Sequence, residues 1–408
     1  MTRALIIGGG IAGPVTAMAL QKAGHDATIY EAWERTAEGV GAFMNISPSG
    51  LDALACLGLD DLVRRTGFDT PAMAFYRHNG RPLTGDVPFD PSSGTGNTTV
   101  DRSDLYIALR DEAQRRGIAI EYQKRLVGAQ RIGDTVEATF ADGSTAEGDL
   151  LVGADGLNSR VRSIIDPDAP SPRYVGVLNA WGRVPDYVSD LAPGVIRMYF
   201  GRKCFFMYTQ APNGELRWYA NPPRATASDV LTGGPAWQAE LIELFKGDRM
   251  PAADIVRRTP DAPAPFLNCD MPSAPRWHRD SMIIIGDAAH AASPTSGSGA
   301  SKAMEDAVIL AKCLRDQPTI DQAFATFEAV RRPRVEAIVA QGKRNIEGNL
   351  LGPVRRRLRD YFIAGKFRNL PAAGSGKTMW THEHHIDWDS PQPTIDTSAS
   401  AYRTPAAK

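Results

Sequence analysis

The stretch RALIIGGGIAGPVTAMALQKAGHDATIYE, residues 3–31, decides the fold. Residues 3–7 predict a buried β-strand because four apolar residues follow Arg3 and directly precede a run of glycines. Residues 11–24 then show the helical spacing of apolar side chains and end at Gly24, a typical helix C-cap. Residues 27–31 predict a second strand. This strand–helix–strand unit indicates a Rossmann-like α/β domain built on a parallel sheet.

The loop inside this unit is suited to a dinucleotide. Gly8, Gly10 and Gly13 match the pattern G-x-G-x-x-G, with Ala12 in the same turn. Such glycines allow a tight turn, close approach of the backbone to a pyrophosphate, and close packing of helix on strand. Glu31 ends the second strand, where an acid hydrogen-bonds a ribose hydroxyl and disfavours a 2′-phosphate. The loop therefore predicts FAD or NAD, and does not choose between them.

Composition excludes several classes of protein. The chain has 408 residues and a net charge of −1, so we expect no nucleic-acid partner, which would need a clustered basic excess. We find no apolar run of about 20 residues that could span a bilayer, and glycines interrupt the apolar N-terminus. The four cysteines are far apart and predict reduced thiols. We expect a cytoplasmic protein without membrane contact.

The domain pattern is discontinuous. Residues 1–170 and 280–345 predict the dinucleotide-binding domain, which also contributes substrate-sheet strands at about 72–100. Residues 171–279 predict an inserted substrate domain with a mixed or antiparallel sheet, because aromatic and polar residues alternate from 172 to 222. Residues 346–408 predict a C-terminal helix and an irregular tail, partly disordered or draped over the body. The tail cluster His382–His385 has no assigned role, and we expect no metal site.

Two further motifs follow predicted strands. DLLVGADGLNSRVR, residues 149–162, ends a strand at Asp155 and then begins a helix. IIIGDAAHAASPTSGSGASKAMEDA, residues 283–307, leads a strand into Gly286 and Asp287, then avoids large side chains until another helix starts. Such a stretch lets the backbone approach something flat or phosphorylated.

Together with GGGIAG, these motifs resemble the group A flavoprotein monooxygenases, the para-hydroxybenzoate hydroxylase family, over residues 1–345. The resemblance implies that the cofactor is FAD and that Asp287, after Gly286, bonds its ribityl chain. It implies that Pro294 lies beside the flavin ring. It also implies that Gly297 to Ser301, including Gly299 and Ala300, offer backbone N–H groups to the N1/O2 edge. This chain has Ser298 where many members have Gln.

Other site residues follow from the same resemblance. Arg102 is expected near the FAD phosphates, and Asp155 near the pyrophosphate and the passing nicotinamide. Arg160 and Arg162 fit that contact and fit solvated helix arginines equally well. His290 is expected to pack under the strand–helix turn rather than act as a base.

Substrate residues are predicted on two segments. Phe43 and Asn45 fall where the family's chain passes the flavin ring. On the inserted sheet the candidates are Tyr199, Phe205, Tyr208, Trp218 and Tyr219, of which half must point away from any one face. Arg183 and Arg217 are candidates to anchor an acidic substrate.

The resemblance implies the reaction. NADH or NADPH, bound transiently, reduces FAD; reduced FAD reacts with O2 to give the C4a-hydroperoxide, which hydroxylates a small aromatic or heteroaromatic compound. The flavin carries this chemistry, so no catalytic side chain is assigned. Two alternatives stay open: epoxidation, oxygenation or cyclisation of a larger polyketide-like product, and a non-catalytic flavin-binding protein. The oligomeric state is expected to be monomer or homodimer.

Overall fold

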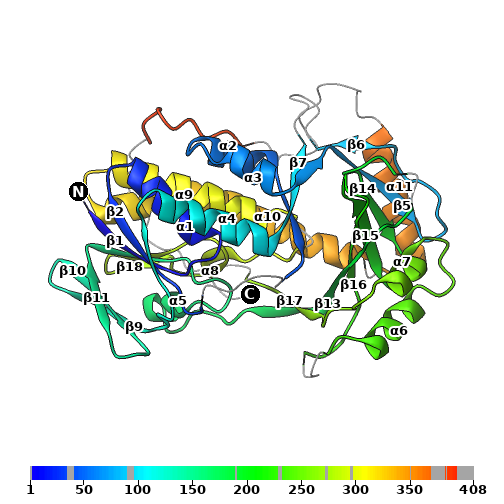
Figure 1. The fold of residues 1–408 in the computed structure, drawn as a ribbon, viewed down its shortest axis with the longest axis horizontal. Helices are drawn as coiled ribbons and strands as arrows, with labels where there is room; N and C mark the ends of the chain where they lie inside the picture. Colours follow the sequence, from blue (N-terminus) through cyan, green and yellow to red (C-terminus); the bar gives the residue numbers. More distant parts are fainter. Residues whose placement is uncertain are drawn as a thin grey trace.

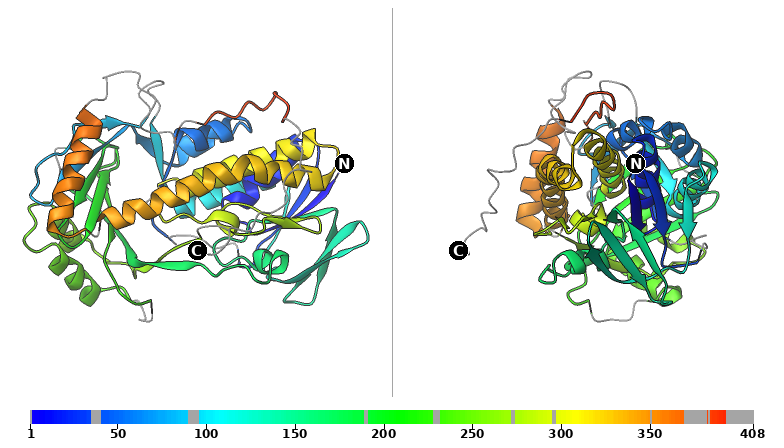
Figure 2. Two further views of the ribbon diagram at one scale, coloured as in Figure 1. Left: turned by 180° about the vertical axis from the view of Figure 1, so that it is seen from behind. Right: turned by 90° about the vertical axis from the view of Figure 1, so that its left-hand side faces the viewer.

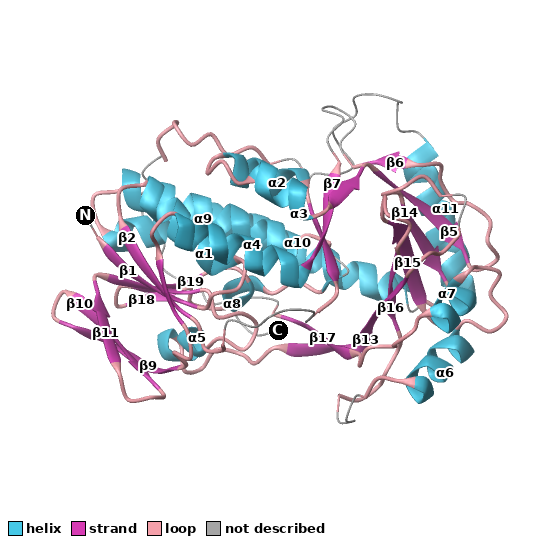
Figure 3. Ribbon diagram, viewed as in Figure 1, coloured by secondary structure: helices cyan, strands magenta, loops and turns pink. Residues whose placement is uncertain are grey.

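The computed structural model describes residues 2–34, 41–89, 96–188, 191–227, 232–271, 274–294, 297–349, 351–368, 382 and 384–392. Within these residues the strands gather in two large sheets at opposite ends of the molecule (Figure 1). The helices α1, α4, α9 and α10 lie beside the sheet that contains β1 and β2 (Figure 3). The helices α6 and α7 cover a face of the sheet that contains β15 and β16. The fold is the expected α/β type with a substrate-sheet insertion.

The first large sheet is six-stranded, with the order β18-β19-β12-β1-β2-β8. All neighbouring pairs are parallel except β18 with β19. The central strands are almost wholly buried and read as continuous apolar runs, as parallel strands covered on both faces do. The strand bounds are β1 Arg3–Ile7, β2 Asp26–Tyr30, β8 Ala119–Glu121, β12 Leu150–Gly153, β18 His278–Arg279 and β19 Met282–Ile284.

Three helices, α1 (Ala12–Lys22), α9 (Gly299–Asp316) and α10 (Ile320–Asn349), pack side by side over this sheet (Figure 2). Both α1 and α9 are buried along most of their length, so they belong to the main hydrophobic core. The long α10 runs from this core toward the second large sheet and continues through Pro333.

The second large sheet is seven-stranded and mixed, with the order β17-β13-β16-β15-β14-β5-β6. Most pairs are antiparallel, and β14 pairs in parallel with β5, which comes from the N-terminal part of the chain. One face is covered by α6 (Pro235–Leu244) and α7 (Ala252–Arg258). The strand bounds are β5 Ala72–Arg77, β6 Val87–Pro88, β13 Arg173–Val184, β14 Ile196–Phe200, β15 Phe205–Gln210, β16 Leu216–Asn221 and β17 Phe266–Asp270.

Two three-stranded sheets accompany the two large ones in the described residues. One three-stranded sheet, β11-β10-β9, turns at Asp142–Gly143, and Gly143 has a φ of +82° there. Another, β3-β7-β4, lies between the large sheets. These strands are β3 Phe43–Ile46, β4 Phe68–Thr70, β7 Asn97–Asp101, β9 Leu126–Ile132, β10 Thr135–Phe140 and β11 Thr145–Gly148. The remaining helices are α2 Pro48–Ala55, α3 Asp60–Thr66, α4 Arg102–Arg115, α5 Arg160–Ile165, α8 Asp287–His290 and α11 Pro353–Arg368.

The described part of the tail, residues 384–392, lies against α2 and α9. Asp52 on α2 accepts from the backbone N–H of Ile386 at 2.8 Å. Lys312 on α9 donates to three backbone carbonyls of the tail, including that of Trp388 at 2.9 Å. This part of the tail is therefore draped over the body and tied to two helices.

Candidate functional site

The first glycine loop is packed on one side and open on the other. Gly8 has a φ of +106°, and a Cβ there would lie 2.4 Å from the Ala154 carbonyl oxygen. A Cβ at Gly13 would lie 1.9 Å from the carbonyl oxygen of Gly8, so α1 can approach β1 this closely only with glycine. At Gly10 the nearest atom is the Tyr106 hydroxyl at 4.0 Å. The loop thus keeps a free surface at Gly10, where a phosphate could approach the backbone.

Glu31 stabilises this loop through a hydrogen bond to its backbone. Its Oε2 accepts from the backbone N–H of Gly9 at 2.7 Å and lies 3.3 Å from Arg110 Nη2. The Arg110 Nε in turn donates to the Gly9 carbonyl at 2.5 Å, and Glu31 is only 6% exposed. The expected ribose contact of Glu31 remains a prediction. Sequence reasoning missed Arg110, although it stands eight residues after Arg102, two helical turns along the same helix.

The second glycine loop follows β19 and shows a different exposure pattern. Asp287, Pro294 and Gly297 are exposed, whereas Ala288 and Ala289 are fully buried. No atom lies within 4 Å of a Cβ built on Gly297, and Gly299 has only Asp287 Oδ1 at that distance, 4.0 Å. This leaves an open surface lined by small residues, with a carboxylate beside it. Such a donor set and such a surface fit the flavin of FAD.

Arg102 connects the two loops. Its Nε donates to the Tyr106 hydroxyl at 2.6 Å, and Tyr106 is the residue nearest to Gly10. Partial enclosure opposes the charge on Arg102, but Tyr106 and Asp287 favour it and raise its pKa above the ordinary value. Gly10, Arg102 and Asp287 therefore lie around one region of the molecule, as their predicted shared role requires.

Asp155 stabilises the start of α5 through hydrogen bonds within its own motif. Asp155 accepts from the Ser159 hydroxyl at 2.5 Å and from the backbone N–H of Arg160 at 2.7 Å, so it holds the first turn of α5. Arg160 donates to the Val127 carbonyl, and the buried Arg162 donates to the carbonyls of Leu157 and Ala288. Neither arginine is simply a solvated side chain. A contact of Asp155 with the cofactor remains a prediction.

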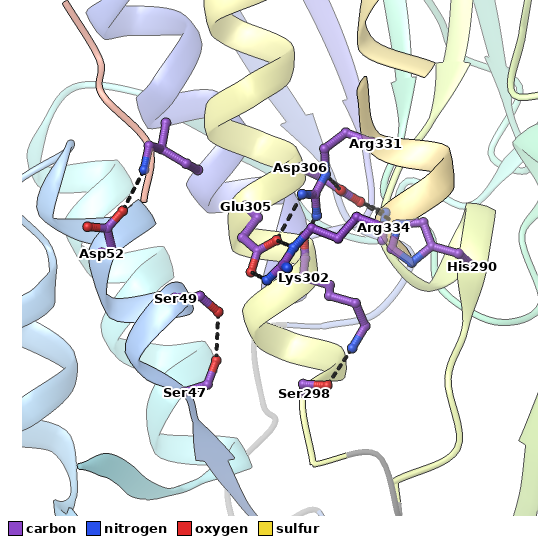
Figure 4. Close-up of polar contacts among 12 residues, drawn as sticks. Ser47, Ser49, Asp52, His290, Ser298, Lys302, Glu305, Asp306, Arg331 and Arg334 are labelled. Atoms are coloured by element: carbon purple, nitrogen blue, oxygen red, sulfur yellow. Dashed lines mark hydrogen bonds and ion pairs between the residues drawn. The ribbon is translucent and has the colours of Figure 1, made fainter. Parts of the chain in front are cut away.

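A buried group of charges lies behind the second loop (Figure 4). His290 Nε2 lies 2.6 Å from Asp306 Oδ2, and Arg331 pairs with Asp306 at 2.7 Å and with Glu305 at 2.8 Å. Arg334 adds a contact to Glu305 at 3.0 Å. Burial alone would raise the pKa of Glu305, but Arg331 and Arg334 hold it at about 2. His290 is thus enclosed under the strand–helix turn, as predicted. The rest of this group was missed because Arg331 lies 25 residues after Asp306 and reaches it only where α10 folds back against α9.

Ser298, the departure from the family pattern, is 3% exposed and stands just before α9. The Lys302 ammonium donates to its hydroxyl at 2.6 Å, and Lys302 is 1% exposed (Figure 4). No local signal in the sequence distinguishes this lysine from a solvated one on a helix.

The alternation of the inserted sheet divides the predicted substrate residues. Tyr208 and Trp218 pair across β15 and β16 and pack in one cluster with α6 and α7. The Trp218 indole N–H donates to the Thr259 hydroxyl at 2.9 Å, and Trp218 is fully buried. The prediction that Tyr208 and Trp218 contact substrate is therefore wrong, because helices cover that face. Tyr199 belongs to the same cluster.

The opposite face of the sheet carries Tyr219, Arg217 and Arg183. Asp101, at the end of β7, lies 2.8 Å from Arg183 and 3.0 Å from Arg217. Since Asp101 directly precedes Arg102, this face of the sheet adjoins the region of the two glycine loops. The Tyr219 hydroxyl donates to Asn179 Oδ1, which also accepts from Asn268 at 2.9 Å. These polar groups could orient a bound molecule.

Phe43 and Asn45 lie on β3, next to β7, and both are half-buried. Asn45 Oδ1 accepts from the Thr99 hydroxyl at 2.6 Å. Their contact with flavin or substrate remains a prediction.

Comparison with known proteins identifies the class. A family model described as FAD binding domain matches residues 1–342. A relative named Aurachin C monooxygenase/isomerase, from Stigmatella aurantiaca, is 30% identical over 82% of this chain and 86% of its own length. The FAD-dependent urate hydroxylase of Klebsiella pneumoniae is 29% identical over 85% of this chain and 90% of its own length.

Solved structures agree. A variant of Klebsiella pneumoniae HpxO in complex with FAD has a TM-score of 0.81 and 26% identity, covering 90% of this chain and 95% of that one. The protein belongs to the FAD binding domain family and, within it, to the group A flavoprotein monooxygenases. It is an FAD-dependent oxidoreductase, as the motifs implied.

In the part of the chain that the structure describes, no helix is both long and apolar enough to cross a membrane. No group of three His, Cys, Asp or Glu side chains there could hold a metal ion.

Proposed function

We propose that this monooxygenase hydroxylates a small aromatic or heteroaromatic compound, using O2 and NADH or NADPH. The observation that carries the proposal is the arrangement of Arg183, Arg217 and Tyr219 on the face of the inserted sheet opposite α6 and α7, next to Asp101 and Arg102. A planar acid or heterocycle would find cations and hydrogen-bonding groups there, beside the region assigned to the flavin.

When FAD is bound, it supplies the redox chemistry: a hydride arrives from NADH or NADPH, one atom of O2 enters the aromatic C–H bond, and the other leaves as water. In this proposal, Gly8, Gly10, Ala12 and Gly13 face the pyrophosphate and Glu31 the ribose. Arg102 and Asp155 lie at the phosphates. The second loop holds the ring region through residues Gly286, Asp287, Pro294, Gly297, Gly299 and Ala300.

The remaining residues bind and orient the substrate. Arg183, with its side chain 34% exposed, is the cation best able to turn toward a substrate carboxylate. Arg217 is held more tightly, between Asp101 and Glu215, and so fixes the position of Asp101. Phe43 and Tyr219 would contact the substrate ring. The active unit is proposed to be a monomer or homodimer.

The test is anaerobic reduction of the bound flavin by NADH and by NADPH, with and without a panel of phenolic and heteroaromatic acids. We expect one class of compound to accelerate reduction strongly and, in air with ¹⁸O2, to gain one labelled oxygen. Arg183→Met should raise the KM for an acidic substrate, whereas Arg224→Met, on the far side of the sheet beside Glu240, should not. Failure of both nucleotides to reduce the flavin would overturn the proposal.

A larger, apolar substrate is the second candidate. The same face of the sheet carries a buried apolar cluster of Met73, Val87, Phe89 and Ile196, with Phe75, Met198 and Met207 packed against it. The relative from Stigmatella aurantiaca is named Aurachin C monooxygenase/isomerase rather than hydroxylase of an aromatic acid. Flavin reduction at one rate with every small acid, together with oxygen transfer to a polyketide-like product, would favour this alternative.

A further inference from the structure

Lys302 is a buried cation in an unusual place. It lies one turn into α9, and its side chain points back toward the helix N-terminus, where the Ser298 hydroxyl accepts from Nζ at 2.6 Å. Both residues are almost fully enclosed. The Lys302 ammonium has three N–H donors, and the acceptor seen for it among the described residues is the Ser298 hydroxyl. A helix N-terminus also repels positive charge. The site therefore disfavours the charged lysine unless an anion lies close.

Two of the nearby carboxylates, Glu305 and Asp306, are already engaged. On α9, Glu305 pairs with Arg331 and Arg334 of α10, and Asp306 pairs with Arg331 and with His290 of α8. Asp287, at the start of α8, is exposed and stands near Arg102. The tail contributes His384, close to Glu305. No carboxylate in the described residues forms an ion pair with Lys302.

These surroundings put the lysine close to neutrality. Burial lowers the pKa of Lys302 to about 7, Glu305 and Asp287 oppose this shift, and Arg331 and Arg334 add to it. A new negative charge at the N-terminus of α9 would raise that pKa and draw a proton onto the amine.

We propose that Lys302 takes up a proton when the flavin is reduced, and that its ammonium, acting through Ser298, balances the negative charge of the reduced ring. Lys302 is thus a positioning residue, since Ser298 stands between it and the loop assigned to the flavin. This inference rests on the proposed placement of the flavin at Gly297 to Ser301. Two electrons and one proton arrive as hydride from the nicotinamide, giving the anionic reduced flavin. The second proton comes from solvent and stays on Nζ of Lys302.

The test is the midpoint potential of the FAD-loaded protein as a function of pH. For a two-electron couple, one proton taken up changes the potential by about 30 mV per pH unit, and two protons by about 60 mV. We expect a slope near 60 mV above about pH 7 in the natural protein and near 30 mV in Lys302→Met. Lys302→Arg should also give about 30 mV, because arginine stays charged throughout.

Lys312→Met is the matched control. Lys312 lies on the same helix and is 2% exposed, but it donates to three carbonyls of the tail and is remote from Ser298. Its replacement should leave the slope near 60 mV. A natural protein with a slope near 30 mV at every pH, or variants at Lys302 with an unchanged slope, would overturn the proposal. If Lys302→Met does not fold, Lys302→Arg decides alone. Failure to retain FAD at all would instead count against the placement of the flavin.

Discussion

At the scale of single residues, Asp287 is the most direct test of the second loop. Its carboxylate is exposed although the two residues after it are fully buried, so it is free to accept from a ligand. A hydrogen bond to a charged group contributes about 1.5–3 kcal/mol. We expect Asp287→Ala to weaken FAD binding by about 10- to 100-fold and to emerge from purification largely without flavin. Asp134→Ala, in an exposed hairpin, is the control. Flavin content equal to that of the control would remove Asp287 from the site.

Glu31 makes a different prediction, because its carboxylate already has partners in the protein. Glu31→Ala would remove the carboxylate that pairs with the buried Arg110 and free the N–H of Gly9. We expect the free energy of unfolding to fall by about 3–5 kcal/mol. We also expect FAD binding to weaken by about 1–3 kcal/mol. Chemical unfolding and FAD titration measure the two effects. Glu34→Ala, which removes only an exposed contact to Gln123, should change neither.

Sequence patterns predicted the residues whose neighbours are close in the chain. Gly8 and Gly13 were found because a local turn requires them, and the crowding around their Cα atoms gives the physical reason. Arg110 and Arg331 were missed, because each acquires its role from a partner on another element. Lys302 was missed although Ser298 is only four residues away, because its burial depends on the elements packed around α9. Nothing local distinguishes a buried arginine or lysine on an amphipathic helix from a solvated one.

At the scale of elements, the contact between α2 and α9 depends on one glycine. A Cβ at Gly50 would lie 2.7 Å from Cβ of Ser301, whose hydroxyl also accepts from the backbone N–H of Ser47. We expect Gly50→Ala to lower the free energy of unfolding by about 1–3 kcal/mol, because the helices must move apart. Gly348→Ala, in α10 with open space around it, should be neutral or stabilise by up to about 1 kcal/mol. Equal midpoints in urea for the two variants would contradict this view of the α2–α9 contact.

The inserted sheet shows how much the alternation of side chains along a strand can predict. Alternation along β16 correctly separates Trp218 from Tyr219, since neighbouring side chains face opposite ways. Which of the two faces is covered depends on α6 and α7, whose packing no pattern in residues 216–221 reports. The sequence predicted that strands at about 72–100 join this sheet, and β5 does so. It did not predict that β5 pairs in parallel with β14, because the two strands are over a hundred residues apart.

At the scale of the whole molecule, the buried charges predict how stability depends on pH. The folded-state pKa of Glu305 is about 2, below its ordinary value of 4.5, and that of Asp306 is also lowered. Their contribution is therefore complete above about pH 4.5 and is lost as the pH falls toward 2. We expect the free energy of unfolding to decline over this range, and Glu305→Gln to flatten the decline. Glu147→Gln, on an exposed strand, should leave it unchanged. Parallel pH profiles for all three proteins would contradict the assignment.

The order of strands in the six-stranded sheet also determines when each strand can pair during synthesis. Strands β1, β2, β8 and β12 all lie within the first 153 residues, but β19, the neighbour of β12, begins at Met282. At about 5–20 residues per second, the ribosome needs several seconds to deliver that partner. Until then the edge of β12 stays unpaired, and the loop at Asp287 does not exist. We therefore expect flavin to bind late in synthesis, after residue 287 has emerged. In nascent chains that end before β19, the exposed edge of β12 must be protected by something other than the cofactor.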